Sequence, residues 1–206
     1  GYEIYLRNAT LYADDMWDAV LEAGKKHNLM VIAPAHHRRI QAGILSWGQD
    51  LDHEHNPFQC NLGYQVSLSG KGEWEKKGDY IGKQALEKMK ADLKDGHKPY
   101  KLQLVGFEIG GKPIDEYAPD FWLVSPGDGG DPCGFITSPW YHPEKGKNIA
   151  MGYIPFDGTL NPNGFPKWEL GKKFKVHLPD IYADEPGVPV DAVTVDVPFT
   201  ESFNAN

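Results

Sequence analysis

The stretch LQLVGFEI, residues 102–109, is a short run of apolar and β-branched residues, followed by the pair Gly110-Gly111. Further runs of this kind follow, separated by glycine, proline and aspartate, the residues that punctuate strands. They lie at residues 121–124, 134–137, 149–154, 174–178 and 188–197. Six or so short strands with turns between them predict a small antiparallel barrel or sandwich.

The chain before this region follows a different pattern. Residues 94–99 are rich in lysine, aspartate, glycine, histidine and proline, which marks a boundary. Within residues 82–93, Leu86, Met89 and Leu93 recur at the spacing of one buried helical stripe. We therefore expect an α+β segment at residues 1–96 and a β-barrel domain at residues 97–206.

Two strands are expected near the N-terminal end. Residues 1–7 alternate between apolar and polar side chains, as a half-buried strand requires, so Glu3 and Tyr5 point to the same side. Residues 29–33 are an apolar run that predicts a short buried strand.

Two helices are expected in the same region. Met16, Val20 and Ala23 recur at three-to-four spacing, which predicts a surface helix packed on one stripe. Pro34 opens a second helix, in which Ile40 and Ile44 share a face.

Composition narrows the function classes. The 206 residues carry 21 Lys and Arg against 29 Asp and Glu, a net charge of -8 with no separate basic run, which argues against a nucleic-acid partner. The sequence has neither an apolar stretch of bilayer length nor a leader, so we expect a soluble, cytoplasmic protein. Cys60 and Cys133 are far apart, which predicts free thiols. A strand at residue 1 has nothing before it to pair with, which indicates a fragment, a processed chain or a missing first half.

The first candidate site is Glu3 beside Tyr5. A carboxylate accepts two neighbouring donors at once, which is how a pterin ring presents its N–H and amino groups, and an aromatic ring supplies stacking. On spacing alone, however, such a pair at the start of a strand is more often a solvated edge.

Several short motifs appear in order along the chain. Together they resemble the glycine-cleavage T-protein (aminomethyltransferase) family, which includes the dimethylsulfoniopropionate (DMSP) demethylases. Each motif is weak alone, but their order and distances make the resemblance strong, and it covers most of the chain. The motifs are GYEIY at 1–5, RIQAG at 39–43, WGQD at 47–50, NPFQC at 56–60, YIGKQAL at 80–86, TSP at 137–139 and IAMGY at 149–153.

Particular residues favour the demethylase branch of this family. The stretch ILSWG at 44–48 resembles the demethylases, and Ala35 stands where T-proteins carry an arginine, which argues against ordinary aminomethyl transfer. Gln41 and Pro139 depart from the family pattern, and the insertion at residues 115–131 matches nothing in it.

The resemblance implies the C-terminal part of the T-protein folate-binding fold, followed by a small antiparallel barrel. It implies transfer of a methyl group from DMSP to N5 of tetrahydrofolate. A dimethylglycine or betaine methyltransferase, an aminomethyltransferase and a non-catalytic folate-binding protein remain alternatives. The expected partners are a small-molecule methyl donor and the missing N-terminal half, which would carry the catalytic aspartate.

The resemblance also implies roles for four residues. Glu3 would grip the pterin, while Tyr5 and Trp47 would face either the folate or the cationic methyl donor. Arg39 would meet the glutamyl carboxylates of the folate, or else anchor its own helix internally.

No metal site is expected. His53 and His55 lie in a turn-rich loop with no third ligand at a suitable spacing. His36 and His37 are adjacent on a helix, so they point about 100° apart. The stretch GDGG at 127–130 lacks the strand and helix that a phosphate loop needs, and reads as a turn.

Overall fold

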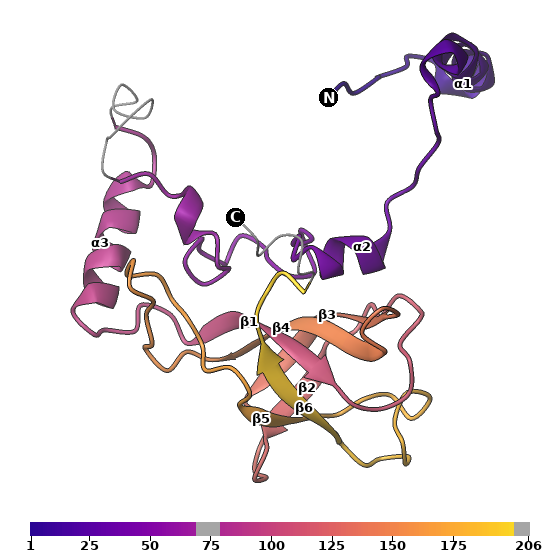
Figure 1. Ribbon diagram of the computed structural model, residues 1–206. Coiled ribbons are helices and arrows are strands. Elements are labelled where there is room, and N and C mark those ends of the chain that lie inside the picture. The colour runs from indigo at the N-terminus through magenta and orange to yellow at the C-terminus, as the bar shows by residue number, and fades with distance from the viewer. Residues whose placement is uncertain (69–78, 200–206) are drawn as a thin grey trace. The chain divides into compact units, whose positions relative to one another are not determined.

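The computed structural model describes residues 1–68 and 79–199. The chain divides into two compact units, Gly1–Ala35 and His36–Asn206, and each is described by itself (Figure 1). The first unit holds α1 (Ala9–Gly24) and the 3-10 turn η1 (Lys25–His27). The second holds α2 (His36–Gln41), η2 (Gly63–Gln65), α3 (Lys83–Lys94) and a six-stranded barrel.

The first unit contains the helix expected around Met16, although α1 buries none of its residues, and it contains neither expected strand. Residues 1–6 and 29–33 run without strand pairing, although the structure describes this unit throughout. The prediction of a buried strand at 29–33 is therefore wrong, since Met30 and Ile32 are 80% and 78% exposed. Alternation fixes which way side chains point, but a strand also needs a partner for its backbone N–H and C=O groups. The described residues supply no neighbouring strand to these two segments.

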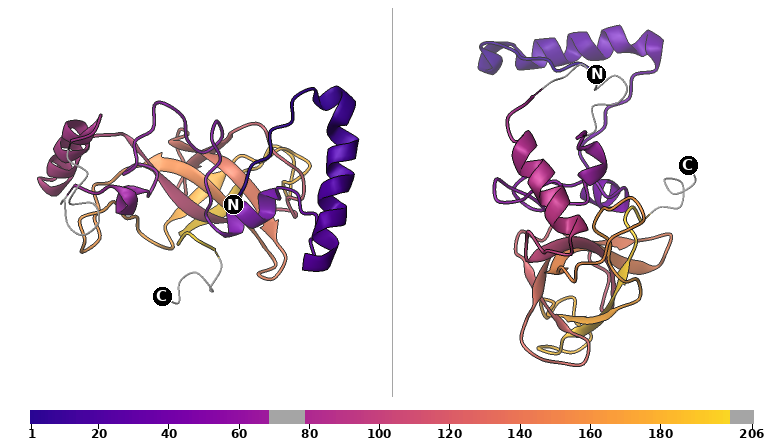
Figure 2. Two further views of the ribbon diagram at one scale, coloured as in Figure 1. Left: turned by 90° about the horizontal axis from the view of Figure 1, so that it is seen from above. Right: turned by 90° about the vertical axis from the view of Figure 1, so that its left-hand side faces the viewer.

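The barrel of the second unit confirms the prediction for the C-terminal region. Its strands are all antiparallel and close in the order β1-β4-β3-β2-β5-β6 (Figures 1 and 2). The unmatched insertion at residues 115–131 contains β2 and so contributes one wall of the barrel. The strands are β1 (Leu102–Ile109), β2 (Trp122–Pro126), β3 (Gly134–His142), β4 (Lys147–Pro155), β5 (Lys173–Val176) and β6 (Val190–Val195).

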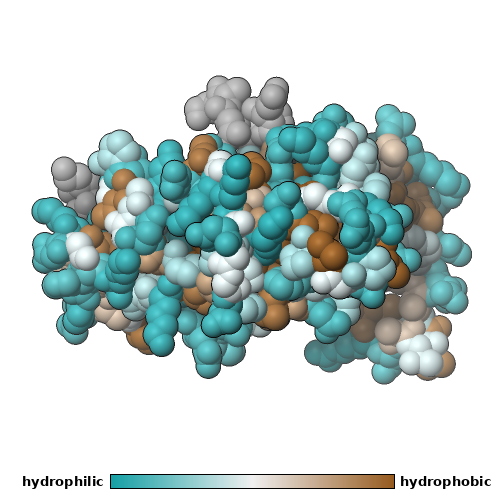
Figure 3. Space-filling view, turned by 90° about the horizontal axis from the view of Figure 1, so that it is seen from below, coloured by the Kyte–Doolittle hydropathy of each residue, from teal (hydrophilic) through white to brown (hydrophobic). Residues whose placement is uncertain are grey.

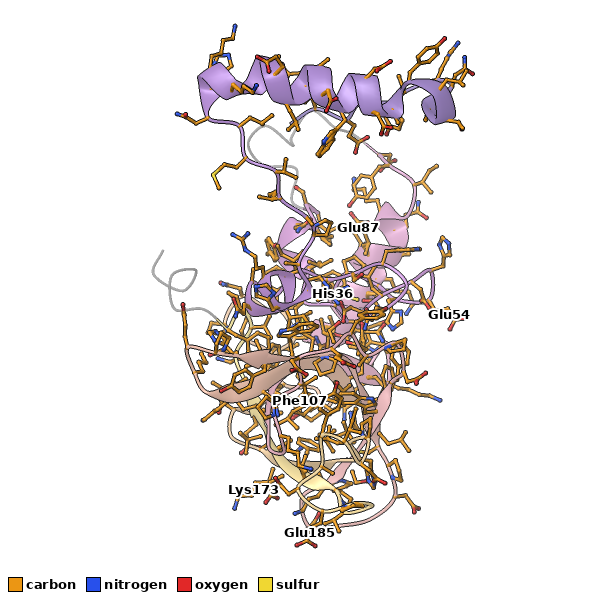
Figure 4. All side chains as sticks on the ribbon, turned by 90° about the vertical axis from the view of Figure 1, so that its right-hand side faces the viewer. His36, Glu54, Glu87, Phe107, Lys173 and Glu185 are labelled. Atoms are coloured by element: carbon orange, nitrogen blue, oxygen red, sulfur yellow. The ribbon has the colours of Figure 1, made fainter. Side chains whose placement is uncertain are left out.

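Strands β1 and β4 are buried on both faces. One face of each points into the main core, where Phe107 and Ala150 lie, and Figure 4 labels Phe107 among these side chains. The other face, with Leu104 and Met151, packs against Ile40 of α2 in a second cluster. Burial on both sides explains why these two strands are nearly continuous apolar runs rather than clean alternations.

Helix α2 is shorter than the sequence predicted. Gly43 adopts φ 66°, and its N–H donates to the Ile40 carbonyl while the Ile44 N–H donates to the Arg39 carbonyl. This is a Schellman end, which needs a left-handed residue and so favours glycine. Ile40 is 1% exposed and Ile44 59%, so the expectation that they share one buried face is wrong.

Helix α3 packs as predicted. Leu93 is buried, and Leu86 and Met89 pack beside it against Phe58 and Phe156 in a third cluster. The helix therefore joins the loop that precedes it to the end of β4.

Hydrophilic residues cover most of the face drawn in Figure 3. Among the residues that the structure describes, no helix has the length and apolar character that crossing a membrane requires.

Candidate functional site

Glu3 and Tyr5 contact each other in the first unit. The Tyr5 hydroxyl donates a hydrogen bond to the Glu3 carboxylate, as the shared side of an extended segment allows. This bond raises the pKa of Tyr5, with a smaller contribution from burial. Both side chains are exposed, so the carboxylate and the ring are presented together to whatever approaches them.

Arg39 lies on α2 in the second unit, and its guanidinium is surrounded by internal acceptors. A guanidinium has five N–H donors in a fixed fork, and contacts account for all of them. These contacts favour the anchoring alternative for Arg39, while its folate-binding role stays a prediction. The acceptors are His36 Nδ1 at 3.3 Å, the Ile44 carbonyl at 3.3 Å, Asp50 Oδ2 at 2.9 Å, Gln49 Oε1 at 3.4 Å and Ser138 Oγ at 2.9 Å.

Asp50 is the centre of this network. Its carboxylate is 0% exposed, and Oδ2 accepts from Arg39 and from the Ser46 backbone N–H at 2.8 Å. Oδ1 accepts from the hydroxyls of Thr137 at 2.5 Å and Ser138 at 2.6 Å. Four donors compensate the buried charge, and a buried carboxylate needs such compensation. The network ties α2 and the turn at residues 46–51 to β3.

Tyr153 of β4 extends the network to Cys60. The Tyr153 hydroxyl donates to the Asp50 carbonyl at 2.6 Å, so its single proton is used there. The Cys60 thiol, 3.4 Å away, must then donate to the Tyr153 oxygen. Burial raises the pKa of both groups, which keeps the phenol and the thiol protonated. Both therefore act as structural hydrogen-bond donors.

Trp47 stands on the outer side of the same turn. Its residue is 62% exposed, and its ring meets His53 edge-on with centroids 4.9 Å apart. The turn beneath it is closed by hydrogen bonds from the Gly48 N–H to the Leu51 carbonyl and from the Asp50 N–H to the Ser46 carbonyl, each 2.8 Å. Arg39 and Trp47 thus belong to one hydrogen-bonded assembly, with the arginine inside and the indole outside.

His36, which is labelled in Figure 4, lies at the start of α2 and packs against aromatic side chains. Its ring lies 4.6 Å from that of Tyr117 and 6.3 Å from that of Trp140, centroid to centroid. Burial, and then the nearby Arg39 charge, lower the pKa of His36, and Asp50 offsets part of this effect. The lower pKa favours the neutral imidazole, which is the form that can accept a hydrogen bond from the Arg39 Nε–H.

A cleft of about 320 Å³ opens beside this assembly in the second unit. Its walls include Leu45, Phe58, Phe165 and Trp168, and none of the described residues that line it is charged. Neither Arg39 nor Trp47 lines the cleft.

Among the described residues, no group of three or more histidines, cysteines and carboxylates is placed to hold a metal ion. His55 instead pairs with the Asp52 carboxylate at 2.7 Å. His53 packs on Trp47.

The roles of Asp50, Thr137, Ser138 and Tyr153 were not predicted from the sequence. All four lie in motifs that carried the resemblance, WGQD, TSP and IAMGY, but motif matching gives no contacts. A buried ion pair between residues 11 apart, on a short helix and a turn, leaves no periodic signal in a sequence.

The comparisons with known proteins agree with the resemblance. The family described as GCVT N-terminal domain matches residues 1–70. The dimethylsulfoniopropionate demethylase DmdA of Ruegeria pomeroyi is 30% identical over 181 residues, and the alignment covers 87% of this chain and 42% of that protein. The chain is similar to members of the GCVT, or aminomethyltransferase, family.

Other members of the aminomethyltransferase family match at similar levels. The aminomethyltransferase of Caldanaerobacter subterraneus is 30% identical, and the alignment covers 75% of this chain and 36% of that protein. The crystal structure of aminomethyltransferase T from Bartonella henselae superposes with a TM-score of 0.54 at 20% identity, covering 79% of this chain and 37% of that one. This likeness shows the fold. The chain thus spans about two fifths of the length of the relatives it matches.

Proposed function

We propose that this chain forms part of a tetrahydrofolate-dependent methyltransferase that demethylates DMSP. The observation that carries the proposal is the Glu3–Tyr5 pair, in which a carboxylate and a phenol ring are presented together at the surface. The similarity to this family and the longer alignment with the DMSP demethylase, 87% of this chain against 75% for an aminomethyltransferase, support it.

The residues present fit a reduced folate. A carboxylate has about four lone-pair sites, and the Tyr5 hydroxyl takes one of them, so Glu3 can still accept the adjacent N–H and amino groups of a pterin. The Tyr5 ring beside it offers a stacking surface. Trp47, exposed in the second unit, is the second aromatic surface that we assign to the folate or to the sulfonium.

The transfer would break the S–CH3 bond of the sulfonium and form an N–CH3 bond at N5 of the folate. The bonding pair of S–CH3 stays on sulfur as a neutral thioether, and N5 loses its proton. Because a sulfonium is a good leaving group, the protein has mainly to align donor and acceptor and to exclude water.

An aminomethyltransferase is the second candidate, because members of that activity class match this chain at the same 30% identity. Ala35, at the position where T-proteins carry an arginine, argues against it.

The test is tetrahydrofolate affinity and methyl transfer in the protein as isolated. Charge-assisted hydrogen bonds contribute about 1.5–3 kcal/mol, so Glu3→Ala should weaken tetrahydrofolate binding by roughly 10- to 100-fold. Glu3→Gln keeps one acceptor oxygen, so its affinity for tetrahydrofolate should lie between the affinities of Glu3→Ala and the parent protein. Glu22→Ala is the matched control, since Glu22 is an exposed glutamate of the same unit that pairs with Lys25.

Calorimetry gives the affinities, and chromatography of 5-methyltetrahydrofolate gives the rate with DMSP, dimethylglycine and glycine betaine. Methyl transfer from DMSP supports the proposal. If transfer occurs only from an amine, the assignment of DMSP as the methyl donor is wrong. Tight folate binding without turnover from any donor would point to a non-catalytic protein. Unchanged affinity in Glu3→Ala would remove the basis of the assignment.

A further inference from the structure

The turn at residues 46–51 is hydrogen-bonded to the barrel through Asp50 and through the Gln49 amide. Asp50 contributes both of its polar ends: its carboxylate holds Arg39, Thr137 and Ser138, and its carbonyl accepts from Tyr153. The other side of the turn carries Trp47, which is exposed.

The same carboxylate also sets the conformation of the turn. Asp50 Oδ2 accepts from the Ser46 N–H at 2.8 Å, and the Asp50 N–H donates back to the Ser46 carbonyl at 2.8 Å. These two bonds enclose Trp47 within a ring of five residues. The backbone that carries the indole is therefore held in part by this buried side chain, beside the bond from the Gly48 N–H to the Leu51 carbonyl.

The recorded aromatic neighbour of the Trp47 indole is the His53 ring, edge-on at 4.9 Å, which belongs to the following loop. An exposed side chain that is already ordered loses less conformational freedom when a ligand binds, which increases affinity without any new contact.

We propose that Asp50 is a positioning residue, which holds the Trp47 indole in its surface orientation and through it sets the affinity for the ligand. The second half of this statement rests on the proposed function. Arg39 contributes to the same positioning network. Its five donors are directed inward, and its contacts with Asp50 and Ser138 bridge the turn to β3.

The test is a double-mutant cycle on tetrahydrofolate affinity, using Asp50→Asn, Trp47→Ala and the double variant. Asparagine keeps the size of the side chain, and the Thr137 and Ser138 hydroxyls can turn to accept from its amide, but the charge opposite Arg39 is lost. In the parent background we expect Asp50→Asn to weaken binding about threefold to tenfold. In the Trp47→Ala background the same change should alter the dissociation constant less than about twofold, since pairs that act through one another are not additive.

The indole N–H resonance of Trp47, assigned by its absence in Trp47→Ala, gives a readout that needs no ligand. We expect it to shift or broaden in Asp50→Asn. Asp191→Asn is the matched control, because Asp191 is a barrel carboxylate that is 87% exposed and paired with Lys175, and it should leave both readouts unchanged. If Asp50→Asn does not fold, Ser138→Ala removes one donor from the same carboxylate and should move both readouts in the same direction, by less.

An unchanged Trp47 resonance in a folded Asp50→Asn or Ser138→Ala variant would overturn the positioning role. Equal losses of affinity in both backgrounds would show that Asp50 does not act through Trp47. If the parent protein bound no tetrahydrofolate, the proposed function would fail, and the resonance would still decide whether Asp50 holds the indole.

Discussion

At the scale of single residues, the buried carboxylate of Asp50 is stabilised by hydrogen-bond donors on both of its oxygens. Asp50 is matched by one guanidinium, one backbone N–H and two hydroxyls, so removing any one of them leaves part of a carboxylate unpaired. The sequence supplied Arg39 and Trp47 as candidates through the resemblance. The sequence alone does not reveal that the Asp50 carboxylate links Arg39 to the turn that carries Trp47.

Stability should depend on the protonation of His36. Its pKa is lowered in the folded protein, chiefly by burial and then by Arg39, so the unfolded chain binds the proton more readily. The stability that this shift contributes is present above the unfolded pKa, about 6.5, and is lost as the pH falls toward the folded value.

Urea unfolding at pH 5 to 8 should therefore show a free energy of unfolding that decreases below about pH 6.5. His36→Gln should flatten this decrease but leave a remainder, because burial also lowers the pKa of His142. His97→Gln, at an exposed histidine, is the control and should leave the slope intact. An equal slope in His36→Gln and the parent would contradict the assignment.

At the scale of elements, the barrel strands were largely predictable and the N-terminal strands were not. The prediction for residues 102–109 coincides with β1, and the other five runs each overlap a strand. β3 continues to His142, beyond the predicted end at 137, because Tyr141 and His142 pair with Asn148 and Lys147 in the hairpin. The strand predictions for residues 1–6 and 29–33 were wrong because a strand needs a pairing partner, which the local sequence pattern does not reveal.

A side chain at Gly134 should destabilise the pairing of β3 and β4 through a steric clash. A Cβ built there would lie 2.0 Å from the Tyr153 carbonyl oxygen, which is backbone and cannot move aside cheaply. Gly134→Ala should lower the free energy of unfolding by about 1–3 kcal/mol or more. Lys147→Ala, at the exposed start of β4, is the control and should change it by about 0.5 kcal/mol or less. Equal effects of the two changes in chemical denaturation would show that the strands can separate locally.

At the scale of the whole molecule, the chain is two units of very different character. Helix α1 buries none of its residues, whereas the second unit has three apolar clusters. The predicted boundary near residue 96 stays a prediction. The chain spans 36% to 42% of the length of two relatives, the aminomethyltransferase of Caldanaerobacter subterraneus and the demethylase of Ruegeria pomeroyi.

This difference should appear in limited proteolysis of the isolated chain. Residues 29–33 are exposed and have no strand partner among the described residues, so local opening there costs little free energy, and a protease of broad specificity should cut them early. Mass spectrometry should then find a lasting fragment that begins between residues 30 and 38 and retains the barrel. Loss of the barrel before any cut in that stretch would contradict the two-unit description.

Closure of the barrel has a consequence for how copies of this chain meet. Each of the six strands has a hydrogen-bonded neighbour on both sides, so the sheet offers no open edge as a template. Extended apolar stretches such as residues 29–33 are the kind that seed fibrils by adding to such edges. An extended segment of another copy therefore cannot add to the barrel as an extra strand. Self-association of the second unit through its sheet has to use side-chain contacts, which favours reversible association over fibril-like strand stacking.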